Sequence, residues 1–268
     1  MNSLLHISLL ALALLLPTAA RAVAVDTAAW RVVVLGDSNT WFSGDDCTGE
    51  EGWPRWFAER FRPAALRSYA RSGATWTHTP RTRRDLEEYT EIISDNNVVY
   101  NQAVRLLTDV AAGCLPAPDI IVIAAGTNDA WFRRRRPKVF AQTAAQAFSA
   151  PAPDVSAPAA AVTLAAAVRL DCEMLRAALP EARIVLLTPM QTVAVADTEI
   201  RRTGDLIAAC AARLDLACIR LDSGTCVVSV RERRRRTYTK DGTHTNRAGA
   251  QQVGRYVAEK LLELIANP

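Results

Sequence analysis

Several signatures of other protein classes are missing from this sequence. None of its six cysteines stands in a CxxC spacing, so a zinc or thiol-redox site of that type is not expected. The apolar run at residues 7–16 is too short to cross a bilayer as a helix. Composition shows no sign of disorder or of a collagen-like chain, because half of the 268 residues are hydrophobic. These absences leave an ordinary globular protein that is long enough to fill its own core.

The N-terminal segment has features of a secretory signal peptide. An apolar run at residues 7–16 is followed by Pro17 and by Ala-Arg-Ala at residues 20–22, a pattern typical of a cleavage site. We therefore predict a signal peptide at residues 1–22, one domain at residues 23–268, and a secreted or periplasmic protein. No Lys or Arg precedes the apolar run, which leaves a buried N-terminal helix as the alternative.

The cysteines do not select a disulfide pattern. An even number permits disulfides in an exported protein, but the sequence offers no way to choose among the pairings. Two of the six have the spacing of core residues: Cys172 shares a helical face with Val168 and Leu175, and Cys210 has similar neighbours. We leave the pairing open and predict neither a metal site nor a cofactor.

Short apolar runs alternate with helical patterns along the whole chain. Strands are expected at residues 31–35, 66–70, 119–125, 183–187 and 217–221, and helices at residues 53–61, 97–110, 163–179, 197–214 and 245–265. Apolar strands separated by helices indicate an α/β fold, with a parallel sheet covered on both faces. The Ala- and Pro-rich stretch at residues 150–161 is too short for a domain linker, so we expect an extended loop there.

Four short polar segments follow the predicted strands or precede the last helix. They are Gly36-Asp37-Ser38-Asn39, Ser72-Gly73-Ala74, Gly126-Thr127-Asn128-Asp129 and Asp241-Gly242-Thr243-His244. Ligands of open parallel sheets bind at the carboxyl ends of the strands, so we expect these segments to converge there. Each one alone has an ordinary interpretation as a helix cap or a turn.

Together the four segments contain the parts of an acyl-transfer site. Ser38 is a candidate nucleophile because a turn after the first strand presents it at the rim of the sheet. His244 is the candidate base, since the chain beyond residue 22 holds only one other histidine, His78. Asp241 stands three residues before His244, where a carboxylate can hydrogen-bond the imidazole and fix its tautomer. Ser38 is not part of a GxSxG elbow, which disfavours the α/β-hydrolase fold.

In order and spacing, these segments resemble the four blocks of the SGNH hydrolases, also called the GDSL family. The resemblance implies a flavodoxin-like three-layer sandwich with a five-stranded parallel sheet in the order 2-1-3-4-5. It also implies hydrolysis of esters through an acyl-enzyme, without metal or cofactor. Ser38 is then the nucleophile, His244 the general base and Asp241 its orienting partner.

The same resemblance implies the groups that hold the oxyanion. They are the backbone N–H of Ser38, the backbone N–H of Gly73 and the side-chain amide of Asn128. Family members often carry Asn two residues before the glycine, and this chain has Arg71 at that position. Gly73 is therefore the loosest match.

Two features bear on the substrate. Trp41, Trp76 and Trp131 each stand three residues after a residue of these segments, so they are candidate walls or stacking faces for sugar rings; packing beneath the loops is the alternative.

Arginine runs at residues 133–136 and 231–236 are expected to flank the site and to attract an anionic substrate or a membrane surface. The alternative for these runs is two solvated loops. We expect no nucleic-acid partner, because no aromatic residue interrupts either run.

The predicted function is that of a serine esterase, most specifically a carbohydrate O-acetylesterase acting on glycan or small-molecule esters. A lipase, lysophospholipase or thioesterase acting on longer acyl chains is the second hypothesis. A glycan-binding protein without catalysis is the third, since one fold can serve several functions. The presence of Ser38, Asp241 and His244 argues against the third. We expect no stable membrane insertion, and the sequence leaves the oligomeric state open.

Overall fold

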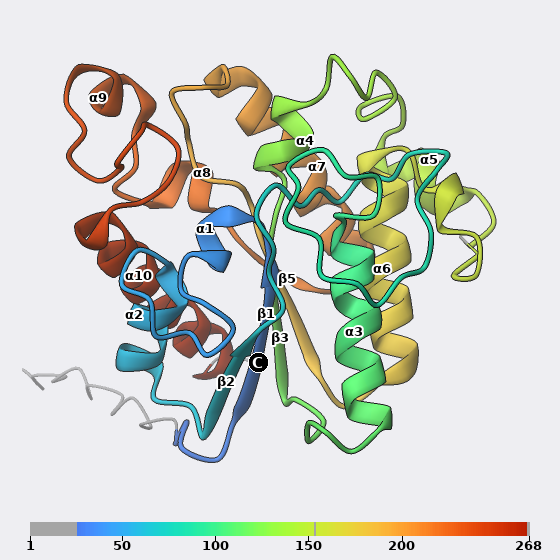
Figure 1. Ribbon diagram of the computed structural model, residues 1–268, viewed down its shortest axis with the longest axis horizontal. Helices are drawn as coiled ribbons and strands as arrows, with labels where there is room; N and C mark the ends of the chain where they lie inside the picture. The colour runs from blue at the N-terminus through green and yellow to red at the C-terminus, as the bar shows by residue number, and fades with distance from the viewer. Residues whose placement is uncertain (1–25, 153, 267–268) are drawn as a thin grey trace, which may run out of the picture.

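The fold is built on one parallel sheet of five strands in the order β2-β1-β3-β4-β5 (Figure 1). The computed structural model describes residues 26–152 and 154–266, so the signal peptide predicted at residues 1–22 lies outside the described residues. The strands are β1 (Arg31–Gly36), β2 (Ala65–Ser68), β3 (Ile120–Ala124), β4 (Arg183–Leu187) and β5 (Ala217–Ile219). This sheet confirms the predicted α/β class and strand order.

Strand composition matches the place of each strand in the sheet. The central strands β1 and β3 are almost wholly buried and, apart from Arg31 and Gly36 at the ends of β1, consist of Val, Ile, Leu and Ala, as expected of parallel strands covered on both faces. The edge strands β2 and β5 are shorter and partly exposed. Alternate side chains of β1 point to opposite faces, with Val32 and Val34 in one core and Val33 and Leu35 in the other.

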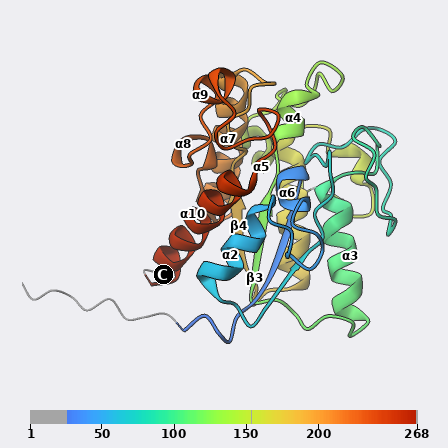
Figure 2. The same cartoon turned by 60° about the vertical axis from the view of Figure 1, so that its left-hand side comes forward.

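Helices cover both faces of the sheet and complete the three layers (Figure 2). One face carries α2 (Trp53–Phe61) and α10 (Arg247–Ala266), which bury aromatic and Val side chains against it. The other face carries α3 (Val99–Ala111), α6 (Leu164–Ala178) and α7 (Asp197–Arg213). Helices α2 and α10 approach closely at Gly254, where a Cβ would lie 2.4 Å from the carbonyl oxygen of Trp53. A larger residue at that position would push the two helices apart.

Short helices occupy the connections. They are α1 (Ser38–Trp41), α4 (Thr127–Trp131), α5 (Ala144–Ser149), the 3₁₀ helix η1 (Pro158–Ala160), α8 (Leu221–Gly224) and α9 (Ser229–Arg234). The Ala- and Pro-rich stretch expected as an extended loop holds only η1 among its described residues. Cys172 and Cys210 are buried, as predicted, and all six cysteines, which lie within the described residues, are free thiols.

No described helix is long and apolar enough to cross a membrane. The described residues also contain no cluster of His, Cys, Asp or Glu side chains arranged to hold a metal ion.

Candidate active site

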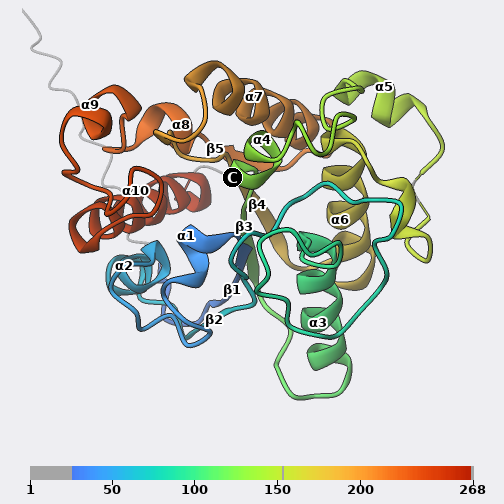
Figure 3. The same ribbon diagram turned by 45° about the horizontal axis from the view of Figure 1, so that its top comes forward.

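Ser38 lies at the carboxyl end of β1, at the point where the strand order reverses. Strand β1 pairs with β2 on one side and with β3 on the other, which is where open α/β sheets bind ligands. Gly36 ends β1 so close to β3 that a Cβ would lie 2.4 Å from the carbonyl oxygen of Ala124. The chain then turns directly into α1, whose first residue is Ser38. Figure 3 shows α1 at this end of the sheet, near α4.

Asp37 fixes the start of α1. Its side chain accepts a hydrogen bond from the backbone N–H of Asn39 at 3.1 Å, and its own N–H donates to the carbonyl of Ala124, so it acts as an N-cap. Burial raises the pKa of Asp37 to about 6, against hydrogen bonds from Asn39 and Thr127 that favour the charged form. The sequence indicated Asp37 only as part of the first segment.

Ser38, His244 and Asp241 form a continuous chain of hydrogen bonds. Nε2 of His244 lies 3.0 Å from Oγ of Ser38, across 206 residues of sequence, and Nδ1 of His244 lies 2.6 Å from Oδ2 of Asp241. A carboxylate can only accept, so Nδ1 carries the proton and Nε2 is left to accept from the serine hydroxyl. The ring of His244 also packs edge-on against Phe42.

The loop that carries Asp241 holds its carboxylate by three donors. Oδ1 accepts from the backbone N–H groups of Thr243 and His244, and Oδ2 contacts the imidazole. Partial burial opposes the charge, but the hydrogen bonds from His244 and the backbone outweigh it and hold the pKa of Asp241 below its usual value. The charged form is therefore the one that the site stabilises.

Glu232 organises this loop from beneath, and sequence reasoning missed it. Its side chain is 1% exposed and accepts from the backbone N–H groups of Tyr238 and Thr239, at 3.0 Å each, and from the Thr239 hydroxyl. The same hydroxyl accepts from the N–H of Gly242 at 3.1 Å. One buried carboxylate thus connects α9 to the turn between Asp241 and His244. The sequence signal was its position as the single acid inside an arginine run.

The second and third segments lie beside the first. The backbone N–H of Arg71 donates to the carbonyl of Gly36 at 3.1 Å. The side-chain Nδ2 of Asn128, in α4, donates to the carbonyl of Ala74 at 2.9 Å. An amide nitrogen has two protons, so this bond leaves one N–H of Asn128 for another acceptor. Gly73 has a left-handed φ of +77°, and a Cβ there would lie 2.5 Å from Cα of Ile92.

Arg71, which stands where family members often carry Asn, serves a structural role. Its side chain is almost fully buried and forms ion pairs with Asp45 and Glu88. It also donates to the carbonyl of Ala70. The departure from the family pattern therefore ties the second segment to the loop after α1.

Asp129 is a second residue whose importance only the structure reveals. It is fully buried and accepts from the backbone N–H groups of Trp76 and Thr77 and from the Thr77 hydroxyl, at 2.7–3.0 Å. These bonds hold the chain beyond Gly73 against α4. Its place beside Asn128, directly after a buried strand, was the available sequence signal.

The three predicted tryptophans have different environments. Trp41 is half-buried at the end of α1 and, with Phe42, lines a hollow of about 520 Å³. Trp131 ends α4 and is 42% exposed. Trp76 corrects the prediction: its side chain is fully buried in the core, because the bond from its backbone N–H to Asp129 turns it inward. It cannot contact a substrate in this conformation.

Both arginine runs lie at the same end of the sheet as α1 (Figure 1), and each mixes surface and structural residues. In the run at residues 133–136, Arg134 and Arg135 are exposed, but Arg136 is partly buried and donates to Thr75 and Thr77. In the run at residues 231–236 the arginines are exposed, while Glu232 is buried. Neither run is simply a solvated loop.

The chain is similar to known proteins at the level of family and fold. The model of the GDSL-like lipase/acylhydrolase family matches residues 34–252. None of the curated proteins compared with this chain matches it significantly.

Several solved structures share the fold. A protein from Bacteroides ovatus assigned as a GDSL-like lipase has a TM-score of 0.57 at 16% identity, covering 88% of this chain and 99% of its own. The acetyl xylan esterase AlAXEase has a TM-score of 0.52 at 16% identity, with coverage of 88% and 99%. A protein from Agrobacterium tumefaciens assigned as an arylesterase has a TM-score of 0.53 at 18% identity, with coverage of 87% and 99%. Similarity at this level of identity establishes the fold alone.

The family match spans four segments whose residues now lie together at one end of the sheet. It also covers well over half of the chain. We conclude that this chain belongs to the GDSL-like lipase/acylhydrolase family, a family of ester hydrolases.

Proposed function

We propose that the protein is a serine esterase in which Ser38 is the nucleophile, His244 the general base and Asp241 its orienting partner. The hydrogen-bonded chain from Oγ of Ser38 through His244 to Asp241 is the observation that supports this most strongly. Oγ attacks the ester carbonyl while its proton passes to Nε2 of His244. That proton then goes to the leaving alcohol, which departs and leaves an acyl-enzyme. His244 next takes a proton from water, which attacks the acyl group and releases the acid.

The backbone N–H groups of Ser38 and Gly73 and the free N–H of Asn128 are proposed to hold the oxyanion. Asn128 is the best supported, because its hydrogen bond to Ala74 fixes the amide and leaves one proton unused. Donors that are already oriented cost no reorganisation when charge develops on the oxygen.

Asn128→Ala should lower kcat for p-nitrophenyl acetate by about a hundred- to a thousandfold, the usual cost of losing one oxyanion donor. KM should change little, because the donor acts mainly on the transition state. Steady-state kinetics and thermal unfolding of the variant provide the measurement. A kcat within about threefold of the parent in a folded variant would remove Asn128 from this role.

Glu232→Gln should lower both kcat and stability. An amide has one oxygen, so its NH₂ group would face a backbone N–H from which the carboxylate now accepts a hydrogen bond. Breaking one such buried bond costs about 1–3 kcal/mol. We expect kcat to fall by roughly tenfold as the Asp241 loop loosens, together with a measurable drop in Tm. The matched control is Glu181→Gln, at an exposed site after α6, which should change neither. A Glu232→Gln variant with a lower Tm but unchanged kcat would show that Glu232 acts on stability alone.

For the substrate we propose an O-acetylated carbohydrate. Trp41 and Trp131 present partly exposed indole faces at the ends of α1 and α4, and such faces stack on sugar rings. One structure with the same fold is an acetyl xylan esterase. The proposal therefore concerns small acyl groups on a glycan.

Longer acyl chains are the second candidate, and one observation favours them. Ile92, whose backbone packs against Gly73, and its chain neighbour Ile93 are more than half exposed, and Trp131 adds further exposed apolar surface. Exposed apolar side chains of this size near a site can bind an aliphatic chain.

Hydrolysis of p-nitrophenyl acetate, butyrate and octanoate separates the two candidates. Activity that depends on Ser38 and is strongest with acetate supports the acetylesterase, and release of acetate from acetylated oligosaccharides then identifies the glycan. A preference for octanoate would reverse the order of the candidates. A folded protein that hydrolyses none of the three, yet binds a glycan, would favour the non-catalytic alternative.

A further inference from the structure

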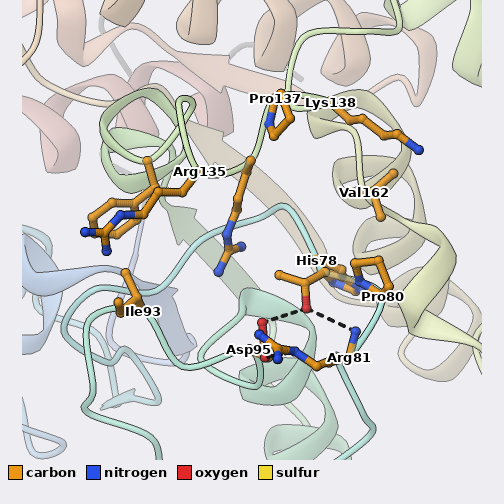
Figure 4. Close-up of a pocket in the computed structure, with 12 residues that line it drawn as sticks. His78, Pro80, Arg81, Ile93, Asp95, Arg135, Pro137, Lys138 and Val162 are labelled. Carbon is orange, nitrogen blue, oxygen red and sulfur yellow. Dashed lines mark hydrogen bonds and ion pairs between the residues drawn. The ribbon is translucent and has the colours of Figure 1, made fainter.

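A pocket of about 570 Å³ lies between the loop that starts at His78 and the chain that follows α4 (Figure 4). Its volume is within the range of roughly 300–1,000 Å³ that is typical of small-molecule sites. His78 and Ile93 come from one wall, and Phe132, Arg135, Arg136 and Lys138 come from the other. None of these residues belongs to the proposed catalytic group.

Both walls continue the segments that are proposed to hold the oxyanion. The backbone N–H of Phe132 donates to the carbonyl of Asn128 at 2.8 Å. Ile93 follows Ile92, whose backbone packs against Gly73. A ligand in the pocket would therefore lie next to the proposed ester site and on the side of Gly73 and Asn128.

The pocket has an excess of positive charge. Arg81 is paired with Asp95 at 2.8 Å. The side chains of Arg135 and Lys138 are exposed and have no hydrogen-bond or ion-pair partner among the described residues; only their backbones are bonded. Arg136 is partly buried and donates to Thr75 and Thr77, which carry no charge. A guanidinium that is removed from water without a contacting carboxylate favours binding of an anion.

His78 supplies an uncharged hydrogen-bond acceptor beside these cationic donors. It is 2% exposed, and its Nδ1 lies 2.6 Å from the carbonyl of Pro158, which can only accept, so Nδ1 carries the proton. Burial lowers the pKa of His78 to about 4, so the ring is neutral at neutral pH. Its Nε2 is then an acceptor, which is itself buried at the pocket wall and has no hydrogen-bond partner among the described residues. Such an acceptor requires a hydrogen-bond donor, and a hydroxyl group can supply one.

We propose that this pocket is a subsite for a carboxylated sugar residue of an acetylated acidic polysaccharide. Arg135, Arg136 and Lys138 supply the positive charge that attracts the carboxylate, and His78 accepts a hydrogen bond from a ring hydroxyl. The apolar sides of Phe132 and Ile93 pack against the C–H face of the sugar. This inference rests on the function proposed above and specifies its substrate class.

Binding of an unacetylated oligomer tests the subsite without requiring catalysis. Tri-galacturonate is titrated calorimetrically into the protein at low salt, and a neutral xylotriose serves as the comparison ligand. We expect tri-galacturonate to bind at least tenfold more tightly than xylotriose. The double substitution Arg135→Gln/Lys138→Gln should weaken its binding by at least tenfold. Arg134→Gln removes one exposed charge from the same run, outside the pocket lining, and should leave the affinity within about twofold.

Three results would overturn the subsite: no binding of tri-galacturonate, equal affinity in the double variant, or an equal loss in Arg134→Gln. The last would mean that the run acts only through its general charge. His78→Asn keeps a donor for Pro158 and removes the Nε2 acceptor. If this variant folds, it should also bind tri-galacturonate more weakly. Unchanged affinity would show that His78 is not part of the subsite.

Kinetics separate this proposal from the catalytic one. With acetylated galacturonate oligomers the double variant should raise KM by about tenfold at unchanged kcat, and its rate with p-nitrophenyl acetate should not change. Retained binding of tri-galacturonate without any ester hydrolysis would contradict the catalytic proposal and leave the subsite standing.

Discussion

Ser38→Ala should lower kcat for p-nitrophenyl acetate by about 10⁴-fold or more, the scale observed when the nucleophile of a serine triad is removed. The reason is that Oγ of Ser38 is the hydroxyl that the described structure places at Nε2 of His244, at 3.0 Å. Among the described residues its side chain makes this one hydrogen bond, so the melting temperature should remain within a few degrees of the parent.

The matched control is Ser149→Ala at the end of α5, an exposed residue whose hydroxyl donates to the carbonyl of Ala145 in the same helix. This variant should retain full activity. A Ser38→Ala protein with more than about a hundredth of the parent kcat would show that another group performs the attack.

Asp241→Asn should reduce kcat by a comparable amount, about 10⁴-fold. The amide can still accept from the backbone N–H groups through Oδ1, so the loop should keep its shape. However, its nitrogen would donate toward Nδ1 of His244, which stabilises the tautomer that carries a proton on Nε2. In that tautomer His244 cannot take the proton of Ser38.

Kinetics of this variant across a range of pH provide the measurement. Asp215→Asn is the control, because Asp215 is exposed and has a φ of +54°, which asparagine adopts readily. An Asp241→Asn variant with near-normal kcat would mean that His244 is held in its working tautomer by something other than this carboxylate.

The sheet could be predicted from sequence because its strands are unambiguous. Strands β1, β3 and β4 are apolar runs in which nearly every residue is buried, and such runs between helical patterns indicate a parallel sheet. The sequence predicts the second strand at residues 66–70, whereas β2 spans Ala65–Ser68 and so begins one residue earlier and ends two residues earlier. Half of its residues are exposed, so it lacks a continuous apolar run.

The proposed site could be predicted in part, because one of its two contacts joins residues that are close in sequence. The contact between Asp241 and His244 is local, so spacing alone suggests it. The contact between Ser38 and His244 joins residues 206 apart. Periodicity carries no information on such a pair. Its prediction depends on the expected convergence of polar segments at the carboxyl ends of the strands and on the family resemblance.

Buried charges account for what could not be predicted. Glu232 and Arg136 sit inside runs that read as solvated surface, but hydrogen bonds from distant loops draw them inward. The burial of Trp76 has a similar cause, because the hydrogen bond from its backbone N–H to Asp129 fixes the direction of its side chain. The loop at residues 78–97 forms one wall of the pocket of about 570 Å³ that is proposed to bind an acidic sugar. It has no hydrophobic periodicity from which its path could be inferred.

The claim that Ser38 forms a covalent intermediate is tested most directly by labelling with diisopropyl fluorophosphate, followed by peptide mass mapping. The reagent needs a serine activated by a neighbouring base, and Nε2 of His244 at 3.0 Å places that base beside Ser38. We predict one adduct per molecule, on the peptide that contains Ser38, formed in parallel with the loss of p-nitrophenyl acetate hydrolysis. Hydrolysis that continues after Ser38 is fully labelled, or inactivation with the adduct on another residue, would contradict the account.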